Sequence, residues 1–196
     1  MDQSGAGIAY RYFFETEEVP TMIKLIEDRD LWKFKYKESK DFHSYLLSKP
    51  FDCDVYTKIF EESSNEETLK DIIKKGEALS EYSAEVVKKI CDLASFQYIN
   101  GRKCGFVNTT SHWAEVGEYM IEHFGLDYSI AFTVDFKLGA IKGSIRRPKG
   151  LDCTILAEHF GGGGHKGAAG FSVSISKGIE EVMYDIDAFI YDNRDK

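Results

Sequence analysis

Four consecutive glycines followed by a histidine stand near the C-terminal end of the chain, in the segment GGGGHKGAAG at positions 161–170. Each glycine costs conformational entropy on folding, so a simple turn gives no reason for four of them. Periodicity predicts a helix before the segment, over 152–160, and the alternation Phe171, Val173, Ile175 predicts a strand after it. The run must therefore form a short loop in an α/β domain, where another group approaches the backbone closely.

Such a loop has the chemistry of an anion site. Peptide N–H groups of a glycine loop form a concave nest that favours phosphate, and His165 stands at its edge as a hydrogen-bond donor. The alternative is a flexible linker followed by an exposed histidine. Linkers are rich in serine and other polar residues, whereas this run leads into Ala168, Ala169 and Phe171. The context favours a site.

Composition narrows the function classes. With 196 residues, 43% of them hydrophobic, the chain is long enough to bury a core. It lacks an apolar run of about 18 residues and a secretory signal, which predicts a cytoplasmic protein that does not enter a membrane. The four cysteines are widely spaced and are expected to be reduced. A net charge of −8 argues against long-range attraction to duplex nucleic acid but leaves room for a short anionic ligand in a local basic pocket.

The hydrophobic pattern changes along the chain. Residues 1–66 are predicted to be mainly helical, and a long helix over about 67–97 is predicted to connect two domains, as a connector spanning 67–100. From residue 101 to 196 strands and helices alternate. The expected elements there are strands over 105–108, 128–136 and 140–146 and helices over 112–124 and 178–192.

Two further groups of charged residues are candidates for chemistry. Arg146 and Arg147 end a predicted strand, and an arginine beside a phosphate nest supplies bidentate contacts to phosphate; the alternative is a pair of solvated edge charges. In the segment IEDRDLW, Asp28 and Asp30 oppose the dipole at the C-terminal end of a helix, which favours a metal-facing role over capping. The alternative for these aspartates is a surface ion-pair network.

The order of motifs resembles one known family. SGAGIAYRYFF, LIEDRDLWKF, PFDCDVY, SIRR and GGGGHKGAAGF follow one another in the chain. This order resembles the DHH-family phosphoesterases, in the branch of oligoribonuclease and exopolyphosphatase-like hydrolases. The resemblance implies an α/β protein: a mainly helical N-terminal remnant of a catalytic domain and a connector helix, then a smaller α/β substrate-binding domain with a mixed sheet.

The resemblance also implies roles for particular residues. The substrate's phosphate and terminal nucleotide would contact Arg146 and the run Gly162, Gly163, Gly164 and His165, with His165 also the catalytic residue. Asp28 would be the last acidic ligand of a two-manganese site, with Asp30 the less favoured candidate. The family's DxD and DHH motifs, which carry the other ligands, would precede SGA. No DHH triplet occurs in this sequence and no DxD stands before SGA, where residues 1–2 match the end of a strand.

Two classes of function follow. The first is a metal-dependent phosphoesterase that acts on or binds short oligonucleotides, cyclic dinucleotides or related phosphate esters, incomplete as a catalyst. The alternative is a non-catalytic module that binds nucleotides or RNA ends, or a regulatory subunit. Apolar faces over 4–14 and 22–26, where a catalytic sheet would pack, predict either a homo-oligomer or a partner that supplies the missing catalytic domain.

Overall fold

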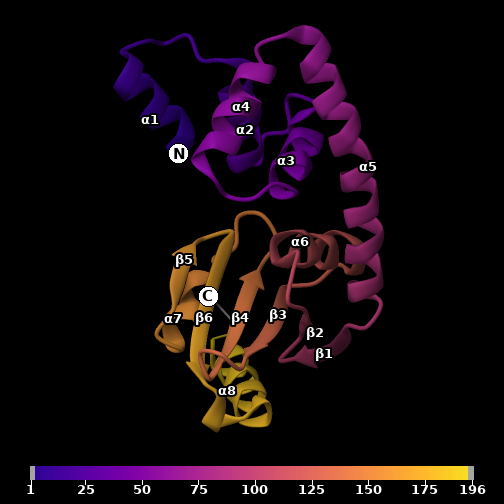
Figure 1. Cartoon of the computed structure of the whole chain (residues 1–196). Helices are drawn as coiled ribbons and strands as arrows, with labels where there is room; N and C mark the ends of the chain where they lie inside the picture. The colour runs from indigo at the N-terminus through magenta and orange to yellow at the C-terminus, as the bar shows by residue number, and fades with distance from the viewer. Residues whose placement is uncertain (1–2, 194–196) are drawn as a thin grey trace. The chain divides into compact units, whose positions relative to one another are not determined.

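The computed structural model describes residues 3–193, so the strand end predicted at residues 1–2 lies outside the described part. The chain divides into two compact units, Met1–Ala84 and Glu85–Lys196, and Figure 1 shows the first as helices and the second as a sheet with helices. The predicted α/β class with a mixed sheet is confirmed. Helices of the first unit are α1 (Gly5–Phe14), α2 (Thr21–Asp30), α3 (Ser39–Leu47), α4 (Cys53–Glu62) and most of α5 (Glu66–Cys91).

A small apolar core holds the first unit together. It combines Met22 and Leu25 of α2 with side chains of α3, α4 and α5, among them Phe42, Ile59 and Ile72. Of the two faces predicted to be exposed, that of α2 is therefore wrong, because Met22 and Leu25 are buried within their own unit. The outer side of α1 matches the prediction, since Tyr12, Phe13 and Phe14 are exposed.

The start of α1 is fixed by polar contacts. The hydroxyl of Ser4 accepts the N–H of Gly7 at 3.1 Å and so caps the helix. Arg11 binds the carboxylate of Glu27 on α2 through both terminal nitrogens, at 3.1 and 3.3 Å. That contact holds the pKa of Glu27 below its ordinary value. A side chain at Gly7 would overlap the same carboxylate, which explains a glycine inside this helix.

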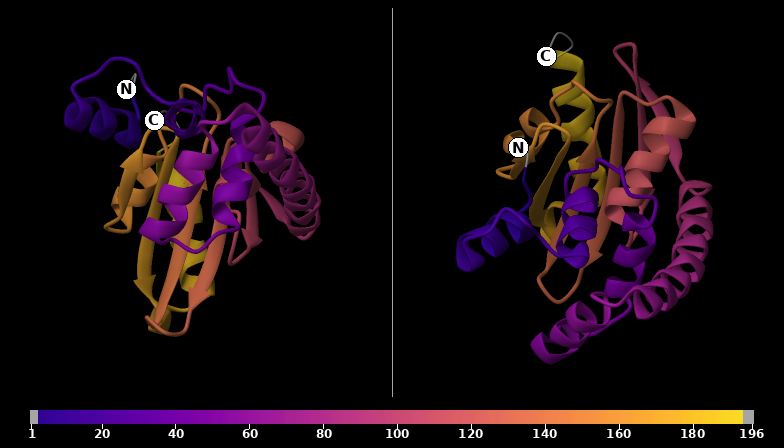
Figure 2. Two further views of the ribbon diagram at one scale, coloured as in Figure 1. Left: turned by 45° about the horizontal axis from the view of Figure 1, so that its top comes forward. Right: turned by 90° about the horizontal axis from the view of Figure 1, so that it is seen from above.

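The second unit contains a six-stranded sheet in the order β1-β2-β3-β4-β6-β5. Strands β2 (Arg102–Asn108) and β3 (Tyr128–Asp135) are parallel and are joined by α6 (Trp113–Phe124), while all other neighbours are antiparallel. Figures 1 and 2 show the sheet from three directions, with α6 beside β3 and β4. The remaining elements are β1 (Ser95–Ile99), β4 (Ala140–Arg146), α7 (Thr154–His159), β5 (Gly163–His165), β6 (Ala168–Ser174), a 3-10 turn (Ile175–Lys177) and α8 (Ile179–Asp192).

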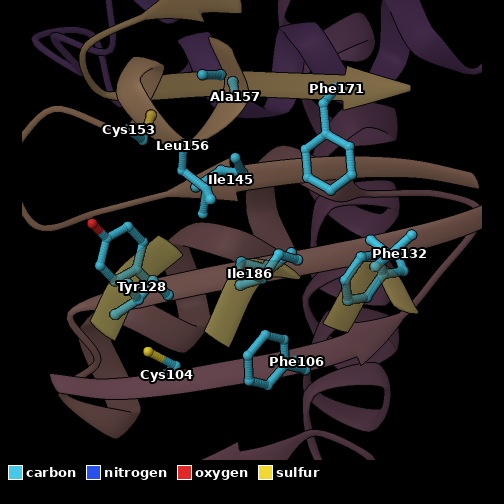
Figure 3. Close-up of a cluster of buried hydrophobic side chains, with 14 of the residues drawn as sticks. Cys104, Phe106, Tyr128, Phe132, Ile145, Cys153, Leu156, Ala157, Phe171 and Ile186 are labelled. Carbon is cyan, nitrogen blue, oxygen red and sulfur yellow. The ribbon is translucent and has the colours of Figure 1, made fainter. Parts of the chain in front are cut away.

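The two faces of this sheet differ in character. One face, here called the α7/α8 face, carries the large apolar residues of the strands, which pack on α7 and α8. Figure 3 shows Phe106, Phe132 and Phe171 gathered near Ile186 of α8. The opposite face, here called the α6 face, packs Val107 and other small residues on α6 and the end of α5. Burial of the apolar set, at about 25 cal/mol per Å² of buried apolar surface, fixes which way every strand residue points.

The largest differences from the predicted elements lie at the end of α5 and in the glycine run. The long helix α5 ends at Cys91 instead of residue 97, and Ser95–Ile99 form the edge strand β1. The strand β1 exposes most of its side chains, so it lacks the apolar alternation that marks a half-buried strand. The glycine run also contains a short strand, β5, which pairs with β6. Within residues 3–193, none of the helices combines the length and apolarity needed to cross a bilayer.

Candidate functional site

The two arginines of SIRR point to opposite faces of the sheet. Arg146 lies on the α6 face, where the helical residue Gly117 contacts its side-chain stem. Arg147 is buried on the other face, with its guanidinium 4.2 Å from the ring centre of Tyr128 and one N–H donating to the Asp152 carbonyl at 2.9 Å. Burial lowers the pKa of Arg147. Strand alternation therefore buries Arg147 on the core side of the sheet and leaves Arg146 partly exposed on the α6 face.

Strand register brings Arg146 and His165 into one row. Arg146 of β4 lies opposite Ala168 of β6, and Ala168 lies opposite His165 of β5. Directly opposed residues share a face, so both side chains project from the α6 face, two strand spacings or about 9.6 Å apart. The small Ala168 between them leaves the space open. The structure thus places in one row the two residues that the sequence analysis assigned to one phosphate.

Arg146 has little to bind within its own chain. Its guanidinium donates to the carbonyl of Ile145 at 3.0 Å, and within residues 3–193 it forms no ion pair. Burial raises the pKa of Glu118 on α6, and the charge of Arg146 opposes that shift. The imidazole of His165 is exposed and donates to no described residue. Both groups are available to an anion on the α6 face.

Gly117 determines how close α6 approaches Arg146. A Cβ atom at Gly117 would lie 2.6 Å from Cγ of Arg146, and 3.4 Å from its Cβ. Because real Cβ contacts are never so short, only glycine lets the arginine stem pass beneath the helix. Gly117 is therefore part of the geometry that directs Arg146 beyond the edge of α6.

The four glycines serve different purposes. Gly161 and Gly164 have φ angles of 72° and 149°, which favour glycine. A side chain at Gly162 would overlap the carbonyl of Gly170. Gly163 has neither reason, since its φ is not positive and a Cβ there would meet nothing within 4 Å. The absent side chain at Gly163 leaves space on the surface next to His165.

The amides of the run are partly used by the helix before it. The N–H of Gly161 donates to the backbone carbonyl of Glu158 at 2.9 Å, and the N–H of Gly162 donates to the backbone carbonyl of Ala157 at 2.8 Å. These two amides end α7 and are not available to form the expected nest. At the other end of the loop, the amide and thiol of Cys153 donate to the carbonyls of Lys166 and His165, at 3.0 and 3.5 Å. The loop that carries His165 is thus fixed to both ends of α7.

A cavity of about 430 Å³ opens on the α6 face. Its base is a row of small residues opposed across the strands: Ala131, Ser144 and Gly170, which continues to Gly163. Gly161 and Gly162 line one side and Trp113, the first residue of α6, lines another. The size is typical of a site for a small molecule.

The proposed metal ligand Asp28 lies in the first unit. Its two carboxylate oxygens accept the N–H groups of Lys35 and Tyr36, at 2.9 and 3.1 Å, and only 4% of the residue is exposed. Burial opposes ionisation, but these hydrogen bonds hold the pKa of Asp28 below its ordinary value. Asp28 therefore organises the loop that follows α2. Asp30 is exposed to solvent.

The described residues do not fit a pair of manganese ions. Within residues 3–193, no three His, Cys, Asp or Glu side chains lie together in a way that would hold a metal. Both oxygens of Asp28 are already engaged by the backbone. The role of Asp28 as a metal ligand therefore stays a prediction.

Among the cavity residues that sequence reasoning missed are Lys142, Ser144 and Trp113. Lys142 and Ser144 alternate with Arg146 along β4, so the strand pattern alone places them on the same face. The alternation in AIKGSIR therefore contained enough information to place Lys142 and Ser144 beside Arg146. Trp113 carries no comparable signal, because its position over the sheet depends on how α6 packs.

Comparison with known proteins agrees with this geometry. Residues 110–192, all within the second unit, match the DHHA1 domain family. The predicted resemblance to the DHH family is thereby confirmed over these residues. Uncharacterized protein R106 of Acanthamoeba polyphaga mimivirus is 27% identical over 184 residues, which cover 91% of this chain and 43% of that protein. The chain thus spans less than half the length of this relative.

Two solved structures share the fold. The pGpG-specific phosphodiesterase PggH of Vibrio cholerae has a TM-score of 0.59 at 14% identity, covering 95% of this chain and 72% of that one. The DHH domain of a member of a ribosomal protein family has a TM-score of 0.59 at 16% identity, covering 79% of this chain and 41% of that one. At such identities the likeness is one of fold.

Proposed function

We propose that this chain binds the phosphate groups of short oligonucleotides, cyclic dinucleotides or related phosphate esters through its DHHA1 domain. The observation that carries the proposal is the row on the α6 face, where Arg146 and His165 project on either side of Ala168 and, within residues 3–193, neither forms an ion pair. A guanidinium gives two parallel hydrogen bonds to a phosphate, and the imidazole donates a third. Gly163 leaves room beside them, and PggH, which shares the fold, is named for a dinucleotide substrate.

In this proposal hydrolysis requires metal ligands beyond those of the described residues, whether from another segment or from a partner subunit. The metal that the family resemblance implies is manganese, and its ligands would come from residues other than those described here. Arg146 and His165 would orient the phosphate, and His165 would stabilise charge that develops on it. The exposed aromatic side of α1, with Tyr12, Phe13 and Phe14, supports a homo-oligomer or such a partner. We assign the protein to the cytoplasm, which its free thiols support.

A second candidate is a binding module without catalysis. It is favoured by Asp28, whose carboxylate is already used in holding the backbone of its own loop. In that case the protein would capture a nucleotide or an RNA end, in the presence or absence of metal. The two candidates share the phosphate site and differ in turnover.

Calorimetric titration with the 5′-phosphorylated dinucleotide pUpU, in EDTA and in manganese, tests the shared part. Arg146→Ala should weaken binding by about 10- to 100-fold, the value of a lost charge-assisted hydrogen bond. Lys137→Ala, which removes an exposed charge at the β3–β4 turn, is the matched control. Equal affinity of the Arg146→Ala variant and the parent would refute the proposal.

Release of UMP from pUpU separates the two candidates. Turnover with manganese that is lost in His165→Ala favours the phosphoesterase, and shows that a complete metal site forms. Binding in EDTA with no release of UMP in manganese favours the binding module. A longer chain that extends upstream, if it alone hydrolyses pUpU, assigns this chain to substrate binding within an enzyme.

A further inference from the structure

The cavity on the α6 face begins one row beyond the phosphate row, because Ser144 and Gly170 line it whereas Arg146 and His165 do not. Along β4, Ser144 lies two residues from Arg146 and Lys142 lies two residues further, so successive rows are about 6.8 Å apart. The base of the cavity is the row of Ser144, while Lys142 and Trp113 line its far side. An occupant whose phosphate meets Arg146 would thus extend through the cavity toward Trp113.

Trp113 is held in a fixed orientation. Its indole N–H donates both to the carbonyl of Thr109, at 3.1 Å, and to the hydroxyl of Thr133 on β3, at 3.0 Å. The preceding residue, His112, has a left-handed backbone with φ of 56°, a costly conformation for a residue with a side chain. Despite these restraints, 43% of Trp113 remains exposed. A rigid, half-exposed indole is a surface for stacking a planar ring.

The base of the cavity consists of small residues, and its far side combines the indole of Trp113 with the ammonium of Lys142. Ala131, Ser144 and Gly170 leave no long side chain on the sheet, so a planar group has room above it. Lys142 is fixed by an ion pair with Asp135 at 2.8 Å. Its ammonium group has three N–H donors and uses one here, so others remain for a ring oxygen or nitrogen. An apolar ligand would gain nothing from this lysine.

We propose that this cavity is a nucleobase subsite, in which the base of the nucleotide whose phosphate meets Arg146 and His165 stacks on Trp113 and accepts a hydrogen bond from Lys142. The inference rests on the proposed function, because the phosphate row sets where the nucleotide begins. The phosphate row and the base of the cavity are adjacent rows, about 6.8 Å apart. This distance leaves room for a ribose between the phosphate and the base. The chain therefore distinguishes nucleotides from simple phosphate esters.

The test compares ligands with and without a base. The probes are pUpU and the same diribose phosphate backbone with abasic sugars, titrated calorimetrically into the full chain. The parent should bind pUpU at least about tenfold more tightly than the abasic backbone, as expected for loss of stacking of one base on an aromatic ring. Trp113→Leu should remove this difference and leave the abasic affinity unchanged, whereas Trp113→Phe should keep most of it. Thermal unfolding of each variant checks that α6 is intact.

Tryptophan fluorescence gives a second measurement. Trp32→Phe, in the first unit, leaves Trp113 as the sole tryptophan and is the matched control for loss of an indole. Its emission should be quenched by pUpU and unchanged by the abasic backbone. Equal affinity for both ligands with unquenched emission overturns the base subsite and leaves the phosphate site standing. Failure of both ligands to bind overturns the proposed function and this inference together.

Discussion

The segment around Asp28 and the row of Arg146 and His165 use charged side chains in opposite ways. In the first unit Asp28 accepts two backbone N–H groups, and Arg29 stacks 3.8 Å from the ring centre of Trp32. In the second unit Arg146 and His165 project from the sheet, and within residues 3–193 neither forms an ion pair. Charges whose partners lie within the chain hold the fold, while those without such partners are available to a ligand.

The largest effect should come from removing Asp28. Asp28→Ala removes the buried carboxylate that accepts the N–H groups of Lys35 and Tyr36, and losing these two charge-assisted hydrogen bonds should cost about 2–4 kcal/mol of unfolding free energy. Urea unfolding followed by circular dichroism measures it. Affinity for pUpU at a temperature well below the melting point should stay the same. A large loss of affinity without loss of stability would break the comparison, and would favour the metal-ligand prediction for Asp28.

Two adjacent glycines offer a matched pair. Gly162→Ala should destabilise the second unit by about 1–3 kcal/mol, because its methyl overlaps the carbonyl of Gly170. Gly163→Ala has open space and should unfold like the parent, yet weaken binding of pUpU by placing a methyl beside His165. Thermal melts and calorimetric titrations of both variants separate the effects. If Gly163→Ala binds normally, its missing side chain has no bearing on the ligand.

A smaller effect is expected at Gly117. Gly117→Ala forces the stem of Arg146 to move, since the new methyl would lie 2.6 Å from its Cγ. Affinity for pUpU should fall by roughly threefold to tenfold, with stability lowered by about 1 kcal/mol. In the double variant with Arg146→Ala the loss of affinity should not add, because both changes act on one contact. Additive losses would show that Gly117 acts elsewhere.

The smallest expected effect is on how the unfolding free energy depends on pH. The folded pKa of Asp28 lies below its ordinary value of about 3.9, so its contribution to stability is complete above that value and is lost as pH falls through the folded pKa. Unfolding free energy measured from pH 6 down to pH 3 should fall less steeply in Asp28→Asn than in the parent. Parallel curves would mean that the carboxylate contributes nothing through its ionisation.

The sequence predicted the elements whose side chains alternate or repeat, and missed those whose side chains carry no pattern. The strands around Ile130 and Ile145 were predicted because every second residue is apolar and buried. Strand β5 consists of Gly163, Gly164 and His165, which have no apolar alternation, and its pairing with β6 depends on tertiary contacts. The predicted long helix extended past Cys91 because the edge strand β1 is mostly exposed and lacks the apolar alternation that would have indicated a strand.

The candidate site was predicted as a set of residues around one phosphate, but not as a row across three strands. Arg146 and His165 were chosen for their chemistry and their motifs. Their common row follows from the order β4-β6-β5 and its register, which no local pattern encodes. Trp113 depends on the packing of α6 over β3, so its place at the cavity was outside the reach of sequence reasoning.

The attachment of the glycine loop to α7 bears on the kinetics of binding. The amides of Gly161 and Gly162 donate to α7 at one end of the loop, and Cys153 binds the carbonyl of Lys166 at the other. The conformational entropy of this glycine-rich loop is therefore lost when the chain folds, and not when a ligand binds. Hydrogen exchange at Gly161 and Gly162 should be slow in the free protein, and association should proceed without a preceding loop closure.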